Sequence, residues 1–126
     1  MQVTITRVRT EKISEKMERI AKEEVANRLM TAIDYLEQEV PVRTGAYARS
    51  MHLNPRGTTS GTGETSRRKE VSSSPDQERS AMADRLYASL EGLEILDGAT
   101  FVNNAPHAKY VEGYYGVFDQ LRSILK

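Results

Sequence analysis

The two histidines, His52 and His107, are the side chains best suited to bind a metal or to move protons near neutral pH. They lie far apart in the chain, and neither has a second ligand at the spacing that a helical zinc site needs. The chain also contains no cysteine, so it offers no thiolate ligand and no disulfide. We therefore expect surface or interface histidines, with no metal and no cofactor.

Serine and glycine patterns give no better case for catalysis. A serine nucleophile on a sharp turn needs a Gly-x-Ser-x-Gly sequence, which is absent. Gly57, Gly61 and Gly63 form a glycine-rich stretch, but it lacks the Gly-Lys-Ser/Thr ending of a phosphate-binding loop. This pattern favours a flexible loop. We expect the protein not to be an enzyme.

The basic run of Arg67, Arg68 and Lys69 could contact phosphates. Glu64 and Glu70 flank it, and no aromatic residues interleave it as they do in a platform for single strands. The whole chain has 18 basic and 18 acidic residues, so no overall field attracts nucleic acid. We therefore interpret these residues as part of a basic arm that reaches an acidic neighbour or lines a DNA channel. A small nucleic-acid-binding or regulatory protein is the alternative.

Length and composition predict a single domain over residues 1–126. Only 38% of the residues are hydrophobic, with two Phe and no Trp, which indicates a thin core and segments outside it. Partner subunits are therefore expected to complete the fold, and zero net charge does not oppose self-association. No run of about 18 apolar residues exists to span a membrane. The first eight residues are too few and too polar for a signal peptide.

Residues 11–39 carry the clearest periodic signal. Apolar residues recur there, and just beyond, at steps near three and four, which predicts an amphipathic helix: Ile13, Met17, Ile20, Val25, Leu29, Ile33, Leu36 and Val40. Pro41 should end the helix, because the residue before a proline avoids helical geometry. A helix of this length, on the order of 40 Å, exceeds what a compact domain needs. We expect it to protrude or to pack against another subunit.

The rest of the chain predicts shorter elements. Alternation and turn residues indicate three further helices, over 76–91 with Ser74 or Asp76 as its cap, 107–112 and 117–125, and strands over 2–8, 47–53, 93–96 and 99–103. A short helical turn from Gly45 is the alternative at 47–53, and Asp97-Gly98 predicts a hairpin. Residues 54–80, rich in Gly, Ser and Thr, predict a long flexible loop or arm. The sum is an α+β domain with one long helix, two or three shorter helices and a small antiparallel sheet.

Two stretches together carry a resemblance. The first is the long helix followed by Pro41-Val42-Arg43-Thr44-Gly45 and, shortly after, Ser50; the second runs from Phe101 through Asn103-Asn104-Ala105-Pro106 to Glu112-Gly113. In this order the pair resembles the neck, or tail-completion, proteins of tailed bacteriophages. Arg43 stands where that family usually has Asp, and His107 where it usually has Tyr.

The resemblance implies a structural virion protein of the phage neck. Copies would form a homo-oligomeric ring around the DNA channel, joining the portal and adaptor proteins to tail terminator or tail-tube proteins. It would be assembled in the host cytoplasm, with non-specific contact to DNA in the channel and no membrane. The residues that match the family motifs are Pro41, Thr44, Gly45, Ser50, Asn103, Asn104, Pro106, Tyr110, Glu112 and Gly113. Candidate interface or channel residues are Arg43, Arg49, Arg67, Arg68 and Lys69.

The two motifs would need to be held together. Tyr110 and Glu112 are expected near the junction where residues 103–106 end a strand and begin a helix. We hypothesise that Glu112 forms an ion pair with Arg43 or Arg49 and so locks the motifs to each other.

Overall fold

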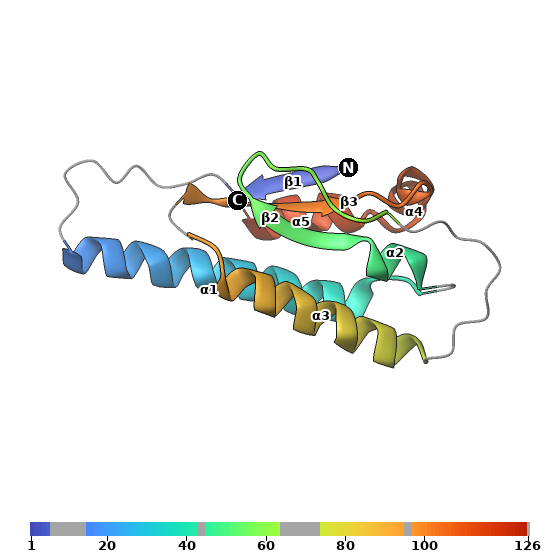
Figure 1. Ribbon diagram of the computed structural model, residues 1–126, viewed down its shortest axis with the longest axis horizontal. Helices are drawn as coiled ribbons and strands as arrows, with labels where there is room; N and C mark the ends of the chain where they lie inside the picture. Colours follow the sequence, from blue (N-terminus) through green and yellow to red (C-terminus); the bar gives the residue numbers. More distant parts are fainter. Residues whose placement is uncertain (6–14, 43–44, 64–73, 95–96, 126) are drawn as a thin grey trace.

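The computed structural model describes residues 1–5, 15–42, 45–63, 74–94 and 97–125 (Figure 1). Within them the chain forms an α+β fold with one long helix and a small antiparallel sheet, as predicted. The elements in chain order are β1 (Gln2–Ile5), α1 (Glu15–Glu39), α2 (Ala46–Arg49), β2 (Met51–Pro55), α3 (Pro75–Glu91), β3 (Ala99–Asn103), α4 (Ala108–Tyr115) and α5 (Val117–Leu125).

The last strand in sequence, β3, is the central strand of the sheet. It pairs antiparallel with β1 on one edge and with β2 on the other, in the order β1-β3-β2. Phe101 lies opposite both Val3 and Leu53, so these apolar side chains share one face. All five residues of β3 are buried, which means that both faces of the sheet are covered along its middle.

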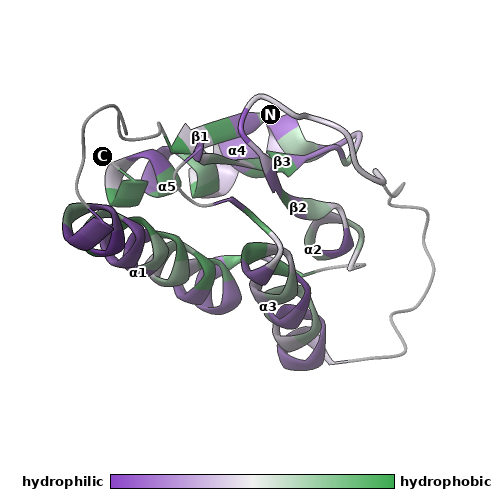
Figure 2. Cartoon of the chain, turned by 60° about the vertical axis from the view of Figure 1, so that its left-hand side comes forward, coloured by the Kyte–Doolittle hydropathy of each residue, from purple (hydrophilic) through white to green (hydrophobic). Residues whose placement is uncertain are grey.

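Helices α1, α3 and α5 form a layer on one face of the sheet. Helix α1 packs against both α3 and α5, while α5 contacts β1 and α3 contacts β2. The hydrophobic side of α1 faces inward in Figure 2. Large side chains that are almost fully buried make up the core between the layers: Leu29, Ile33, Leu36, Val40, Met51, Met82, Leu86, Phe101, Val117, Phe118 and Leu121.

Helix α1 is longer than the part of it that the core covers. Its apolar stripe is buried from Val25 onward, but Met17 and Ile20, on the same stripe, are 58% and 55% exposed. The first turns of the helix extend beyond the sheet in Figure 1. The expectation that this helix protrudes is therefore met for residues 15–24, and Ile13 lies outside the described residues.

Helix α3 begins with a complete capping box. The Ser74 hydroxyl accepts a hydrogen bond from the backbone N–H of Gln77, and the Gln77 side chain accepts one from the N–H of Ser74. Pro75 occupies the first helical turn, where its missing N–H has no helical partner to lose. The last six residues of the predicted 54–80 loop, 75–80, thus belong to this helix.

The outer face of the sheet is covered by residues 56–63, which follow β2. The Asn104 amide donates to the carbonyl oxygens of Thr59 and Gly61 at 3.0 and 3.1 Å. His52 Nε2 lies 2.8 Å from the carbonyl oxygen of Thr62, and the N–H of Gly57 donates to the Thr100 hydroxyl. These residues form a hydrogen-bonded cover over the sheet rather than an extended arm. Residues 64–73 lie outside the described part of the chain.

Two glycines allow this segment to lie against the sheet. A Cβ atom on Gly61, whose φ is +151°, would come within 2.4 Å of the His52 ring. A Cβ on Gly63 would come within 2.1 Å of the carbonyl oxygen of Asn104. The sequence pattern predicts a flexible loop here, but at Gly61 and Gly63 the glycines permit close packing.

Two predicted strands differ from the structure. Residues 46–49 form the short helix α2, which is the helical turn from Gly45 given as the alternative, so the strand predicted over 47–53 begins only at Met51. The hairpin predicted around Asp97-Gly98 is wrong, because both edges of β3 are already paired with β1 and β2, and Leu93 and Glu94 are not in a strand. Residues 6–8, 11–14 and 95–96, which the predicted elements include, lie outside the described residues.

We predict that Gly61→Ala destabilises the protein by about 1–2 kcal/mol, because the added methyl group meets the His52 ring at an unfavourable φ. Gly113→Ala is the matched control, since nothing lies within 4 Å of its Cβ position and the residue is inside α4. Alanine favours a helix interior, so this change should be neutral or stabilising. Urea denaturation measures both, and equal effects would contradict the packing role of Gly61.

A second prediction concerns the tie between α1 and α3. The Tyr87 hydroxyl donates to the Asp34 carboxylate, and this bond, with burial, raises the Tyr87 pKa from 10.0 to about 12. The protonated phenol therefore contributes stability below pH 10, and the contribution is lost as pH rises through about 12. Tyr87→Phe should cost about 1 kcal/mol at neutral pH. The difference in unfolding free energy between wild type and variant should shrink above pH 10. A difference that stays constant with pH would show that the hydrogen bond from Tyr87 to Asp34 does not stabilise the protein.

Candidate functional site: the motif junction and the exposed ends

The two sequence motifs meet at the side chain of Asn103. Its amide nitrogen donates to the carbonyl oxygen of Tyr47 at 2.8 Å, and its amide oxygen accepts from the N–H of Ala105 at 3.0 Å. Asn103 is 1% exposed, so these bonds satisfy a polar group that has no access to water. The end of β3 is thereby joined to α2, and the His107 ring, just beyond it, packs against Tyr47. We call this region the motif junction.

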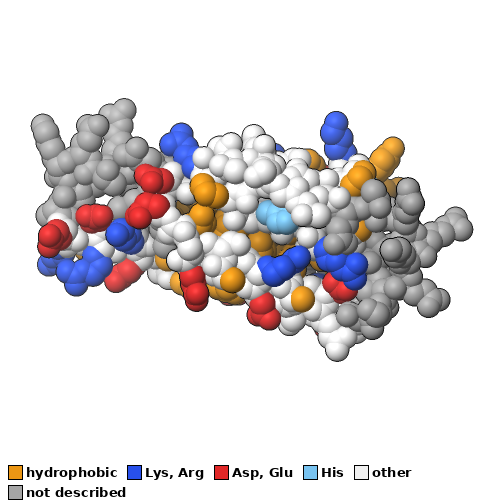
Figure 3. Space-filling view, in the orientation of Figure 1, with side chains coloured by type: hydrophobic (Ala, Val, Ile, Leu, Met, Phe, Trp, Pro, Cys, Tyr) orange, Lys and Arg blue, Asp and Glu red, His pale blue; other side chains and the backbone are white. Residues whose placement is uncertain are grey.

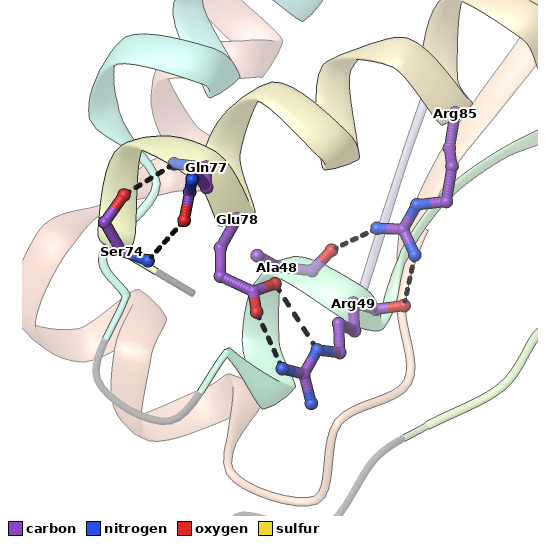
Figure 4. Close-up of polar contacts among 6 residues, drawn as sticks. All are labelled: Ala48, Arg49, Ser74, Gln77, Glu78 and Arg85. Atoms are coloured by element: carbon purple, nitrogen blue, oxygen red, sulfur yellow. Dashed lines mark hydrogen bonds and ion pairs between the residues drawn. The ribbon is translucent and has the colours of Figure 1, made fainter. Parts of the chain in front are cut away.

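A partly buried ion pair holds α2 against α3 on the other side of the motif junction. Arg49 Nη2 lies 2.7 Å from Glu78 Oε1, and Arg49 Nε donates to Glu78 Oε2 at 3.3 Å (Figure 4). The Glu78 side chain is 8% exposed and that of Arg49 is 39% exposed. A two-point contact fixes the orientation of the guanidinium as well as its position.

Gly45 makes room for this pair. It precedes α2 with a φ of +84°, a conformation that other L-residues rarely adopt. A Cβ atom there would come within 3.1 Å of Arg49 Nη2 and 3.2 Å of Glu78 Cδ. The glycine of the first motif thus serves both the turn out of α1 and the ion pair.

The C-terminal end of α2 is held by Arg85 from α3. Arg85 donates to the carbonyl oxygens of Ala48 at 2.8 Å and Arg49 at 3.3 Å (Figure 4). A cation suits the negative end of a helix, because the last carbonyl groups of a helix lack N–H partners further along it. Ser50, fully buried, caps α2 and leads into β2. Sequence reasoning did not identify Arg85 or Glu78, which carry no motif signal.

Glu112 does not form the hypothesised pair with Arg49. Its carboxylate accepts hydrogen bonds from the N–H groups of Phe118 at 2.8 Å and Asp119 at 3.1 Å. It therefore caps the positive N-terminal end of α5 across the bend at Gly116. Arg49 takes Glu78 as its carboxylate partner, so the hypothesised Glu112–Arg49 lock is replaced by these two contacts. Arg43 lies outside the described residues.

Tyr47 and His107 pack together within the motif junction, with ring centroids 6.3 Å apart. The Tyr47 hydroxyl and His107 Nδ1 are buried, and neither has a hydrogen-bond partner among the described residues. Burial raises the pKa of Tyr47, and the charge of Glu112 raises it further. A phenol with a raised pKa stays protonated near neutral pH, so Tyr47 is unsuited to act as a base.

The other motif residues are spread around the motif junction. Pro41 is half-buried after α1, Pro106 and Gly113 are exposed, and Asn104 holds the cover over the sheet. His52 lies on that outer face, away from the helical layer. In the described ranges no three His, Asp or Glu side chains gather closely enough to hold a metal ion. Thr44, Arg67, Arg68 and Lys69 lie outside these ranges.

Two apolar surfaces remain exposed, at opposite ends of the molecule. One is formed by Met17 and Ile20 of α1; the other by Tyr110, Tyr114 and Tyr115 of α4, which are 76%, 86% and 62% exposed. Hydrophobic side chains project at the α4 end in Figure 3, and charged side chains crowd the end where α1 begins. We did not predict a patch here from the sequence. The four-residue spacing of Tyr110 and Tyr114 was the available signal.

A shallow groove of about 400 Å³ lies between α1 and α5, beside Ile20. Its lining is mixed, with apolar side chains and several polar or charged ones: Ile20, Glu23, Glu24, Asn27, Arg28, Thr31 and Ile124. Glu24 pairs with Arg28 at 2.8 Å along the helix. The groove thus combines a small apolar floor with hydrogen-bonding groups, as protein interfaces do.

We predict that Arg49→Ala destabilises the protein by about 2 kcal/mol, because it leaves the buried Glu78 carboxylate without its cation. The matched control is Arg122→Ala, which removes an exposed pair with Asp119 whose side chains are 48% and 76% exposed. That change should cost less than about 0.5 kcal/mol. Thermal or urea unfolding measures both, and similar small losses would show that the Arg49–Glu78 pair does not hold the motif junction.

None of the helices in the described ranges is both long and apolar enough to cross a membrane. Searches of protein-family models, curated proteins and solved structures find no match to this chain.

Proposed function

We propose that this protein is a structural subunit of a bacteriophage neck, a head–tail connector or tail-completion protein that forms a ring around the DNA channel. The observation that carries the proposal is the apolar stripe of α1, which continues past the core to the exposed Met17 and Ile20. Such a stripe is stabilising only when another chain covers it. The resemblance of residues 41–50 and 101–113 to the neck family supplies the kind of assembly.

The motif junction supports a mechanical role. Three of its polar side chains are engaged within the chain, because Asn103, Arg49 and Glu112 bind the backbone or a neighbouring side chain. A subunit that links two rings has to keep its shape while force passes through it. The partly buried Arg49–Glu78 ion pair joins α2 to α3, and the buried hydrogen bond from the Asn103 side chain to Tyr47 joins β3 to α2. Both contacts serve that purpose.

The proposed partners follow from the position in the particle. Other copies of the chain would lie on either side in the ring, the portal and adaptor proteins on the head side, and tail terminator or tail-tube proteins on the tail side. We assign the protein to the virion neck, assembled in the host cytoplasm. Arg67, Arg68 and Lys69 are proposed to reach an acidic neighbour or to contact channel DNA without sequence preference.

Mass measurement in solution tests this function. We expect the purified protein to remain small alone, or to self-associate weakly, and to enter a ring when candidate portal and tail proteins are added. A variant with Arg67, Arg68 and Lys69 changed to Ala should still enter the ring. A protein that ignores these partners but binds plain duplex DNA with a steep salt dependence would contradict the proposal and favour the nucleic-acid-binding alternative.

A further inference from the structure

We propose that neighbouring copies of this chain contact each other head to tail, with the α4 tyrosines of one copy seated in the α1–α5 groove of the next. This rests on the proposed function for the biological setting, but the surfaces themselves are read from the structure. The tyrosine patch is defined by Tyr110, Tyr114 and Tyr115. The α1–α5 groove is the one lined by Ile20 and Ile124.

The tyrosine patch has the properties of an anchor for another protein. Tyr110 and Tyr114 are four residues apart and so lie on one side of α4, and the Tyr114 and Tyr115 rings are 6.5 Å apart. Gly116, in the left-handed conformation, ends the helix directly after them. Tyrosine is enriched at the energetic centres of interfaces, because it supplies a large rigid surface with one polar end.

The α1–α5 groove can accept both parts of such a side chain. Ile20, itself 55% exposed, and Ile124 offer apolar contact to a ring. Glu23, Asn27 and Thr31 line the same groove and can accept a hydrogen bond from a phenol hydroxyl. Met17, one turn before Ile20 on α1, extends the apolar surface at one end of the groove.

Charge is complementary between the two surfaces. The exposed Lys109 lies next to Tyr110 on α4. The groove carries the carboxylates of Glu23 and Glu24 and the guanidinium of Arg28, which pairs with Glu24, so its lining has one net negative charge. A lysine delivered with the tyrosines would meet the Glu23 carboxylate. The whole chain has no net charge, so copies do not repel each other over longer distances.

The exposed apolar side chains of the chain itself indicate that the partner in the α1–α5 groove is a second copy of this protein. Among the described residues, the large apolar side chains that remain exposed are Met1, Met17, Ile20, Tyr110, Tyr114 and Tyr115. Apart from Met1, all of them belong to these two surfaces, so each surface is the main apolar complement available to the other. They lie at opposite ends of the molecule in Figure 1, where α1 begins and where α4 ends. Two different patches meeting in this way give a heterologous contact, which propagates into a ring or filament.

Cysteine cross-linking tests the contact directly, because the natural chain has no cysteine. Ile20→Cys and Tyr114→Cys are made separately and together, and each protein is oxidised at high concentration and in the assembly with portal and tail proteins. We expect the double variant to give a ladder of dimers, trimers and larger species. A mixture of the two single variants should give dimers, and either single variant alone should give none.

Two control variants show whether the cross-links are specific. Glu91→Cys, exposed on α3, replaces Tyr114→Cys in a second double variant and should give no ladder. Tyr114→Ser should not disturb folding, because the Tyr114 side chain is 86% exposed. The variant should weaken self-association at least about tenfold. Dimers from a single cysteine variant would show a symmetric contact and overturn the proposal. The absence of any ladder in both settings would overturn it as well.

The outcomes separate this proposal from the proposed function. A ring that forms with portal and tail proteins, but gives no ladder from the double variant Ile20→Cys with Tyr114→Cys, keeps the neck function and rejects these surfaces. A ladder from a protein that ignores those partners keeps the surfaces and rejects the neck function.

Discussion

The burial of strand β3 on both faces is the constraint on which the rest of the structure depends. A strand covered on both sides must satisfy its polar side chains internally, and β3 carries two, Thr100 and Asn103. The Thr100 hydroxyl contacts that of Thr4 and accepts from the N–H of Gly57, which brings the cover of residues 56–63 onto the sheet. The Asn103 amide takes the Tyr47 carbonyl and so fixes α2 at the end of the sheet. The cover and the motif junction are therefore both consequences of one buried strand.

The middle of the molecule is therefore held by internal polar contacts, whereas its two ends carry exposed apolar side chains. Around the middle, Arg49, Glu78 and Arg85 tie α2 to α3, and Glu112 ties α4 to α5. These polar groups hold elements of the chain to one another. The ends instead present apolar side chains that the domain does not cover. Such a distribution is compatible with the proposed role of a subunit that transmits force between its neighbours.

The sequence predicted the elements whose signals are local. Helices α1, α3 and α5 follow from apolar spacing, and Ser74, one of two candidate caps, begins α3. The Asp97-Gly98 hairpin failed because a turn signal does not say which strands occupy the edges of β3. Residues 47–49 alternate like a strand, yet Tyr47 is buried within a helical turn, an outcome that tertiary contacts decide. The Arg49–Glu78 pair joins residues 29 positions apart with no pattern between them, so it could not be predicted.

The exposed ends should make a contact that is weak singly and strong in a closed ring. Fully burying a large apolar side chain contributes about 1.5–3 kcal/mol, and Met17, Ile20 and the three tyrosines are already partly covered within the monomer. Their combined gain is then on the order of 5–10 kcal/mol, similar to the roughly 4–15 kcal/mol that association costs in lost freedom. A dimer held by one such contact is therefore only marginally stable. In a ring each copy makes two such contacts, and the last one closes without a further loss of free motion. In the proposed neck function, copies of the chain would stay separate until portal or tail proteins gather them, which is the behaviour that ordered assembly of a particle requires.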